Sequence, residues 1–266
     1  MLRDVIRRMV RRFGLQSSSA VLRLRRFYPR PSDSAQLAKM LAHHRVNVVL
    51  DVGANAGQFG KELRLAGYTE RIVSFEPLSA AHAQLLTTAK GDPNWTVVER
   101  MAIGNQEADV TINISADSVS SSVMDMLEAH ISAAPDSVFV AKEQVRMHRL
   151  DNVTRSFLRD DDVVFLKIDV QGFESQVLEG AAQFLPHVAG MQLELSLVPC
   201  YEGQDLLPPM LDRLTAGGFD VWSMSPGTVD QHTGRMLQVD AVLFRAPADR
   251  TTARNTVRPS TAEVSL

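Results

Sequence analysis

The chain has 266 residues, of which 45% are hydrophobic, and a formal net charge of −3. This length suits one α/β domain with a complete core, and the lack of any run of about 18 apolar residues excludes a membrane-spanning helix. A single cysteine, Cys200, excludes an internal disulfide framework and favours a reducing compartment. The arginine-rich N-terminus has no apolar core segment typical of a secretory signal, so we expect a cytoplasmic protein.

The net charge hides an asymmetry between the N-terminus and the rest of the chain. Residues 1–31 contain nine arginines against one acidic residue, Asp4, which leaves −11 for the remaining 235 residues. An acidic body of this kind is not typical of a nucleic-acid-binding domain. Apolar residues recur at helical spacing within residues 1–13, so we expect a basic amphipathic helix. It could contact the inner face of a membrane, or pack on its own domain.

We therefore divide the chain into an arm (1–31), a main domain (32–245) and a polar tail (246–266), which we expect to be disordered. The domain should begin with a helix over 33–44, capped near Ser32.

The stretch Val48 to Gly60 has the pattern of a strand, a glycine-bearing turn and a helix. Asp51 ends the strand, and we expect its carboxylate to accept hydrogen bonds from a ligand. Gly53 would let the backbone turn tightly beside that ligand. A dinucleotide fingerprint needs glycine at the third position, where this chain has Asn55 before Gly57. The pattern therefore favours a nucleoside ligand other than a dinucleotide.

The second strand is expected over 71–75, after a helix at 58–67 closed by Gly67. Phe75, Glu76 and Pro77 follow, and Glu76 lies 23 positions after Gly53. An acidic residue at the end of the second strand can accept bonds from both ribose hydroxyls of a nucleoside. A helix over 78–90 and a strand over 95–99 should follow. Ala102 and Ile103 would then contact an adenine, although core packing of Ile103 explains it equally well.

The middle of the chain is less regular. We expect strands at 108–114 and 144–148, a serine-rich loop at 115–122, and a short helix after 149 capped by Asp151. Residues 123–142 are hard to place and could form a lid. His148, at the end of a strand, is either a candidate base or a packed surface residue.

The second informative stretch runs from Asp162 to Ala181. A buried strand over 163–168 ends at Asp169, Gly172 allows a turn, and Glu174 begins a helix. Because the carboxyl ends of parallel strands meet at one edge of a sheet, Asp51, Glu76 and Asp169 should converge.

A fifth strand over 191–197 contains Glu194, a charge that needs a partner or a crevice. A helix over 206–217 and strands over 219–224 and 238–244 complete the pattern. The expected fold is thus a Rossmann-like, mostly parallel seven-stranded sheet with helices on both faces and an antiparallel final strand.

Together these stretches resemble the FkbM family of S-adenosylmethionine (SAM)-dependent methyltransferases of class I. The resemblance covers about residues 46–245, and its specific part is LKIDVQGFESQVLEGA at 166–181. Further support comes from VVLDVGANAGQFG, FEP at 75–77, AIGN at 102–105, the serines at 120–122, RLDNV at 149–153 and LELS at 193–196. The chain has Gln171 where the family often has Glu.

The family implies SAM as cofactor and methylation of a hydroxyl, commonly on a sugar or a polyketide. A hydroxyl is a weak nucleophile, so a general base is expected. Asp169 is the first candidate, followed by His148 and Glu194, while Glu174 acts either directly or by stabilising its helix. No Cys/His cluster has structural-zinc spacing, and we expect no catalytic metal, although the acidic groups could hold a divalent ion.

Two other classes stay open from the sequence. A nicotinamide oxidoreductase would share the fold and Glu76, and a non-catalytic binding protein could retain the fold without turnover. The acceptor is expected to be a small molecule or a glycolipid. The sequence does not set the oligomeric state.

Overall fold

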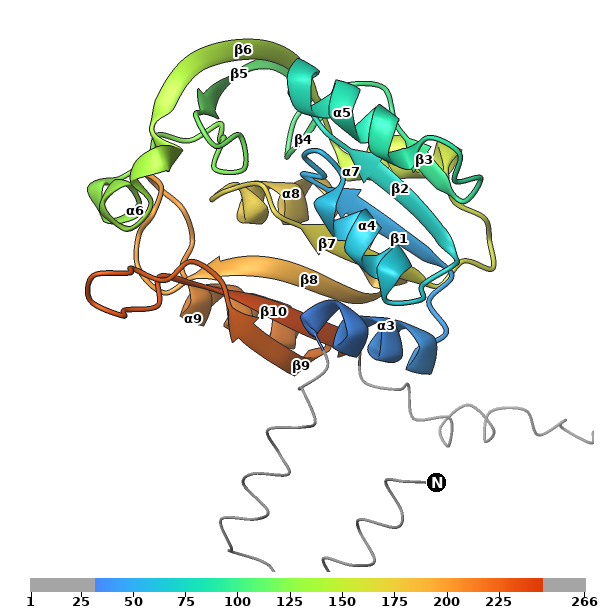
Figure 1. Cartoon of the computed structure of the whole chain (residues 1–266). Coiled ribbons are helices and arrows are strands. Elements are labelled where there is room, and N and C mark those ends of the chain that lie inside the picture. Colours follow the sequence, from blue (N-terminus) through green and yellow to red (C-terminus); the bar gives the residue numbers. More distant parts are fainter. Residues whose placement is uncertain (1–31, 246–266) are drawn as a thin grey trace, which may run out of the picture.

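The computed structural model describes residues 32–245, which form a twisted seven-stranded sheet with helices on both faces (Figure 1). The strand order is β3-β2-β1-β7-β8-β10-β9, and only β10 runs antiparallel to its neighbours. The expected fold class is therefore confirmed. The strands are β1 (Val48–Val52), β2 (Arg71–Phe75), β3 (Trp95–Val97), β7 (Val164–Ile168), β8 (Val188–Ser196), β9 (Phe219–Pro226) and β10 (Gln238–Arg245).

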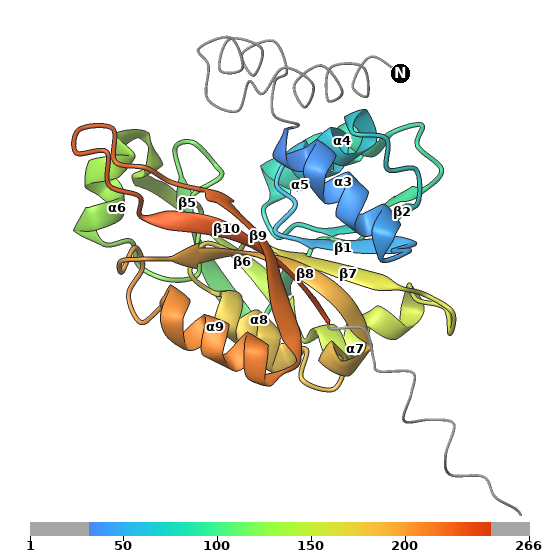
Figure 2. The same ribbon diagram turned by 90° about the horizontal axis from the view of Figure 1, so that it is seen from below.

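Two groups of helices cover the sheet, one on each face (Figure 2). One group is α3 (Asp33–His43), α4 (Gln58–Leu65) and α5 (Ser79–Ala89); the other is α7 (Leu150–Val153), α8 (Glu174–Gly180) and α9 (Leu207–Ala216). Because both faces are covered, β1 and β7 are buried at every position, as expected of central parallel strands. Val49 faces the core under α3 and α4, whereas Val48 and Leu50 face the core under α8.

A smaller sheet adjoins the main one, with the order β4-β6-β5. Its strands are β4 (Ala102–Ile103), β5 (Ala108–Ser115) and β6 (Phe139–His148). Strand β6 is longer than the predicted strand over 144–148, because the segment 139–143 also pairs with β5. Between β5 and β6 lie α6 (Glu128–Ala133) and a short turn of 3-10 helix, Pro135–Ser137. Two further 3-10 turns are Thr154–Ser156 and Leu185–His187.

Two predicted caps had different outcomes. Ser32 caps α3, since its hydroxyl accepts a hydrogen bond from the backbone N–H of Ala35 at 3.2 Å. The Asp151 cap was wrong, because the residue at the N-cap of α7 is Arg149. The Asp151 carboxylate instead accepts bonds from the backbone N–H groups of Gln183 (3.1 Å) and Phe184 (3.0 Å). It therefore anchors the segment that follows α8.

The basic arm (1–31) and the polar tail (246–266) lie outside the described residues, so the expectations about them stay predictions. Between Ser32 and Arg245, none of the helices has both the length and the apolar character that crossing a bilayer requires.

Candidate active site

A cavity of about 320 Å³ opens at the carboxyl ends of β1, β2 and β7. Most of the predicted site residues line it: Gly53, Asn55, Phe75, Glu76, Pro77, Ala102, Ile103 and Asp169. Five other predicted residues do not line it: Asp51, Gly57, His148, Glu174 and Glu194. The placement of each group follows from the strand ends and the turns beside them.

The turn after β1 is shaped by left-handed backbone conformations. Gly53 has a φ of +78°, and a Cβ built on it would lie 1.8 Å from the carbonyl oxygen of Asp169. The glycine is therefore needed where the ends of β1 and β7 approach each other, and because it also lines the cavity, its place beside a ligand stays a prediction. Gly57, with a φ of +88°, precedes α4 and packs toward Leu85 and Trp95.

Glu76, which directly follows β2, lines the cavity. Its side chain is 4% exposed, and its two oxygens accept bonds from the backbone N–H groups of Asn55 and Leu78, both at 2.8 Å. Burial raises the pKa of Glu76 to about 7, although these two bonds act in the opposite direction. Each oxygen keeps a lone pair for a further donor. The carboxylate is thus fixed in position and still able to accept ligand hydroxyls.

An apolar wall lies beside Glu76 and suits a flat aromatic ring. It is formed by Phe75, Met101, Ala102, Ile103, Ile112 and Phe173. Ile103 is 4% exposed and belongs to the main core cluster, and because it also lines the cavity, its contact with an adenine stays a prediction.

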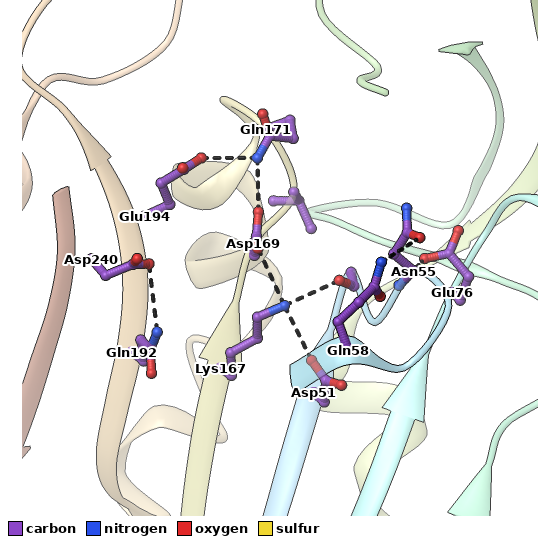
Figure 3. Close-up of polar contacts among 12 residues, drawn as sticks. Asp51, Asn55, Gln58, Glu76, Lys167, Asp169, Gln171, Gln192, Glu194 and Asp240 are labelled. Carbon is purple, nitrogen blue, oxygen red and sulfur yellow. Dashed lines mark hydrogen bonds and ion pairs between the residues drawn. The ribbon is translucent and has the colours of Figure 1, made fainter. Parts of the chain in front are cut away.

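Lys167 lies between two carboxylates on neighbouring strands (Figure 3). Its ammonium is 3.2 Å from Asp51 Oδ1, 3.4 Å from Asp169 Oδ2 and 3.1 Å from the carbonyl oxygen of Gly53. Asp51 and Lys167 are direct partners in the β1–β7 register. Asp51 is fully buried beneath the ammonium, so it cannot contact a ligand as we predicted. Its role is to hold Lys167.

The charges of this buried pair act on each other. Burial raises the pKa of Asp51, and Lys167 opposes that effect. For Lys167, burial alone lowers the pKa, but the charges of Asp51 and Asp169 outweigh it and raise the pKa. The ammonium therefore stays charged in the working pH range. The strand predicted over 163–168 includes this lysine, but the sequence pattern predicts no role for it.

Asp169 is the carboxylate that opens into the cavity, with a side chain 39% exposed. Its Oδ1 accepts a bond from Gln171 Nε2 at 2.8 Å, and the same amide group donates to Glu194 Oε2 at 2.8 Å. The side-chain oxygen of Gln171, Oε1, accepts a hydrogen bond from the Tyr201 hydroxyl at 2.8 Å. A glutamine can therefore bridge two carboxylates here, which an ionised glutamate could not do.

Glu194 acts behind Asp169 and does not line the cavity. Besides Gln171, its Oε2 accepts a bond from Gln238 Nε2 at 2.8 Å. Burial, followed by the charges of Asp169 and Glu174, raises its pKa well above the usual range. This geometry suits a residue that positions Gln171 and not one that takes a proton from the acceptor.

Glu174 and His148 lie away from the cavity surface. Glu174 Oε1 accepts bonds from the backbone N–H groups of Val170 and Gly172, both at 3.2 Å, so it fixes the turn after β7. His148 Nδ1 is 2.7 Å from Glu107 Oε2. His148 ends β6, as the alternation predicted. Its side chain faces Glu107 and does not line the cavity, so this structure gives no support to His148 as the base.

A serine-rich loop forms another wall of the cavity. Ser118, Val119, Ser121, Ser122 and Val123 line it. Asn55 Nδ2 donates to the carbonyl oxygen of Ser118 at 3.2 Å, and Ser122 Oγ donates to the carbonyl oxygen of Gln171 at 2.6 Å. The loop thus spans the turns after β1 and β7. Of the segment 123–142, for which the sequence allowed a lid or an insertion beside the site, only Val123 lines the cavity.

The charged lining favours a cation. It consists of Glu62, Glu76, Asp169 and Asp240 against Lys167, which already serves two carboxylates. Across residues 32–245, we find no group of three or more Asp, Glu, His or Cys side chains arranged to hold a metal ion.

The strand order, the antiparallel β10 and the buried carboxylate after β2 define a Rossmann-like methyltransferase of class I. The chain belongs to the FkbM methyltransferase family: the family model described as "Methyltransferase FkbM domain" matches residues 51–221. The family uses SAM for methyl transfer. No curated protein matches the chain.

Solved structures of low sequence identity share parts of the architecture. Fibrillarin of Aeropyrum pernix, in complex with SAM, is 10% identical with a TM-score of 0.42, covering 74% of this chain and 66% of its own. TehB of Haemophilus influenzae is 10% identical with a TM-score of 0.44, covering 82% and 63%. Magnesium protoporphyrin IX methyltransferase of Synechocystis, with bound SAM, is 11% identical with a TM-score of 0.42, covering 86% and 92%. The chain thus spans just under two thirds of the first two proteins.

Proposed function

We propose that this protein transfers the methyl group of SAM to a hydroxyl group, on a sugar of a glycolipid or of a related secondary metabolite. One observation carries the proposal: the Asp169 carboxylate opens into the same cavity as Glu76 and is held there by Lys167 and Gln171. The family supplies the reaction type, and the choice of oxygen as acceptor atom rests on Asp169.

The residues of the cavity fit SAM. Glu76 would accept bonds from the ribose hydroxyls, and the apolar wall with Ala102 and Ile103 would pack against the adenine. The excess of acidic side chains suits a sulfonium cation, whereas it would repel the pyrophosphate of a nicotinamide dinucleotide. When bound, SAM supplies an electrophilic methyl group.

Asp169 would do the acid–base chemistry. Its carboxylate would accept the proton of the acceptor hydroxyl as the new C–O bond forms and the methyl–sulfur bond breaks, with S-adenosylhomocysteine as the leaving group. Lys167 and Gln171 each bond one of its oxygens, so the carboxylate does not need to reorient during the reaction. Glu194 would hold the side chain of Gln171 in place, and Glu174 would hold the backbone turn after β7 that carries Gln171.

The proposed function is tested by a labelled-methyl transfer screen. Full-length protein and methyl-labelled SAM are incubated with a lipid and glycolipid extract of the source organism, and labelled products are separated. We expect a labelled glycolipid or sugar. Thermal shift with SAM, S-adenosylhomocysteine and NAD gives a second readout, in which only the first two should stabilise the protein. Stabilisation by NAD alone would restore the oxidoreductase alternative.

Removing the Glu76 carboxylate should weaken SAM binding. Glu76→Ala loses charge-assisted hydrogen bonds, each worth about 1.5–3 kcal/mol, or about 10- to 150-fold in Kd. The pKa of Glu76 in the protein without SAM is about 7. Because only the ionised carboxylate offers both oxygens as acceptors, the affinity of the wild type for SAM should be greatest above pH 7 and fall as the pH decreases through that value. Calorimetry at pH 6 and pH 8 measures both effects, and Glu76→Gln should remove the pH dependence. Unchanged affinity in Glu76→Ala would reject the assignment.

Chelation should leave turnover unchanged. The ammonium of Lys167 already occupies the position between Asp51 and Asp169 where a metal would neutralise both carboxylates. Treatment with EDTA followed by desalting tests this expectation. A loss of activity that magnesium restores would overturn it.

The arm at 1–31 gives a separate proposal about location. Five arginines lie between residues 3 and 12, and each contributes about 1 kcal/mol near an anionic surface. Full-length protein should therefore co-sediment with anionic vesicles at low salt and be released at high salt. A form that lacks residues 1–31 should stay in solution. Equal sedimentation of both forms would remove the arm from membrane binding.

A further inference from the structure

A second cavity, of about 180 Å³, adjoins the first on the face covered by α3 and α4. The two cavities share Phe59, Glu62, Gln192 and Asp240 in their linings. The second extends from these residues toward α3 on one side and β9 on the other. At about 30 Å³ per water molecule, it holds the volume of about six waters, enough for one small polar ring.

The lining of this second cavity combines polar and apolar side chains. It contains three carboxylates, two amides and three hydroxyls, together with Phe59 and four aliphatic residues, and none of its described members carries a positive charge. The polar members are Asp33, Ser34, Gln36, Glu62, Gln192, Ser223, Ser225 and Asp240; the aliphatic ones are Leu37, Met40, Leu63 and Val242.

The polar groups retain the capacity to bind a ligand. Gln36 Nε2 donates to Ser223 Oγ at 3.3 Å, and Gln192 Nε2 donates to Asp240 Oδ1 at 3.5 Å. Both bonds are long, so exchanging them for ligand hydroxyls costs little. Amide groups donate and accept, and carboxylates accept at several positions, which matches adjacent hydroxyls on a ring. Burial raises the pKa of Asp240 to about 6, so it is ionised above that pH.

The register of the sheet connects this cavity to the reacting end of the first one. Gln192 on β8 is the direct partner of Lys167 on β7. Lys167 pairs with Asp169, and Gln192 bonds Asp240 (Figure 3). A ligand held at Asp169 by one hydroxyl could thus continue past Gln192 and Asp240 into the second cavity.

We propose that the second cavity binds the part of the acceptor next to the methylated hydroxyl, and that this part is a neutral or amine-bearing polyhydroxylated ring. This inference rests on the proposed function and narrows it. Because the described residues that line the cavity include three carboxylates and no cation, a carboxylated or phosphorylated ring is excluded by repulsion. Phe59 offers the ring an apolar surface where the two cavities meet.

The charge preference is tested without knowing the acceptor. In full-length Ser223→Cys, the only other thiol is Cys200, which is fully buried and whose pKa burial raises to about 11. The thiol at position 223 is modified with a cationic and with an anionic methanethiosulfonate of similar size. Each rate is divided by the rate at which the same reagent reacts with free 2-mercaptoethanol. We expect the normalised rate to favour the cationic reagent by about tenfold or more. Adding Glu62→Gln should reduce that preference. Equal normalised rates would overturn the inference.

Kinetics with defined sugars test the binding of the ring. The acceptors are methyl glycosides of neutral monosaccharides and three disaccharide sets, which are neutral, amine-bearing or uronic-acid-bearing. We expect kcat/KM for neutral and amine-bearing disaccharides to exceed that for monosaccharides by about tenfold, and uronic acids to be poor acceptors. Gln36→Ala should remove the disaccharide advantage, whereas Lys39→Ala, an exposed change on α3 outside the cavity, should keep it.

The outcomes separate the inference from the proposed function. Equal methylation of mono- and disaccharides, with no effect of Gln36→Ala, would overturn the inference and leave the function standing. Methylation of no sugar by the wild type would count against the function, and the thiol rates would still decide the charge preference of the cavity.

Discussion

Asp169→Asn should lower the turnover number by about 100-fold or more, the effect of losing a positioned general base. The asparagine keeps the shape of the side chain and one oxygen, but it cannot take the proton of an acceptor hydroxyl. The fold should stay close to wild type, because Asp51 still pairs with Lys167 in this variant. Single-turnover kinetics with labelled SAM measures the chemical step.

The matched control for this change is Asp161→Asn, which makes the same substitution at an exposed position. It should leave turnover unchanged. Wild-type turnover in Asp169→Asn, under conditions where chemistry limits the rate, would dismiss Asp169 as the base. The expected pattern is thus a loss in kcat with the fold retained.

Lys167→Met should lower the free energy of unfolding by about 3–5 kcal/mol, the cost of leaving a buried charge without its partner. Asp51 is fully buried and has Lys167 as its only ion-pair partner among the described residues. Its other described contact, the hydroxyl of Ser74 at 3.3 Å, cannot replace an ammonium. Urea unfolding followed by circular dichroism measures the change.

Two variants make this stability test specific. Adding Asp51→Asn to Lys167→Met removes the unpaired charge and should recover part of the loss. Lys61→Met, at an exposed position on α4, should change stability by less than about 0.5 kcal/mol. If Lys167→Met costs no more than that control, the buried pair does not stabilise the domain as we infer.

The sequence predicted what depends on local patterns. The apolar run before Asp169 and the glycine after it gave β7 and its turn, and Glu76 was located by its place after the second strand. In each case the signal lies within about ten consecutive residues. For this reason the fold class and eight of the residues that line the cavity followed from the sequence.

What the sequence missed depends on contacts between distant segments. Asp51 looked like a ligand contact because nothing local shows that Lys167, on another strand, covers it. Gly53 lines the cavity, but its close approach to the carbonyl of Asp169 lies beyond the reach of a local pattern. Gln171 stands where the family often has Glu, and nothing local shows that its amide bridges Asp169 and Glu194. A lysine inside an apolar strand, two positions before an aspartate, was the one available signal of this network.

The most direct test of the account is the position of the transferred methyl group. Full-length protein is incubated with SAM carrying a carbon-13 methyl group and the acceptor found in the labelled-methyl screen, and the product is analysed by heteronuclear NMR. We predict a long-range correlation from the labelled methyl to a ring carbon of a sugar through one oxygen, with the product lost in Asp169→Asn. A methyl group on nitrogen or carbon, or equal product from Asp169→Asn, would contradict the account.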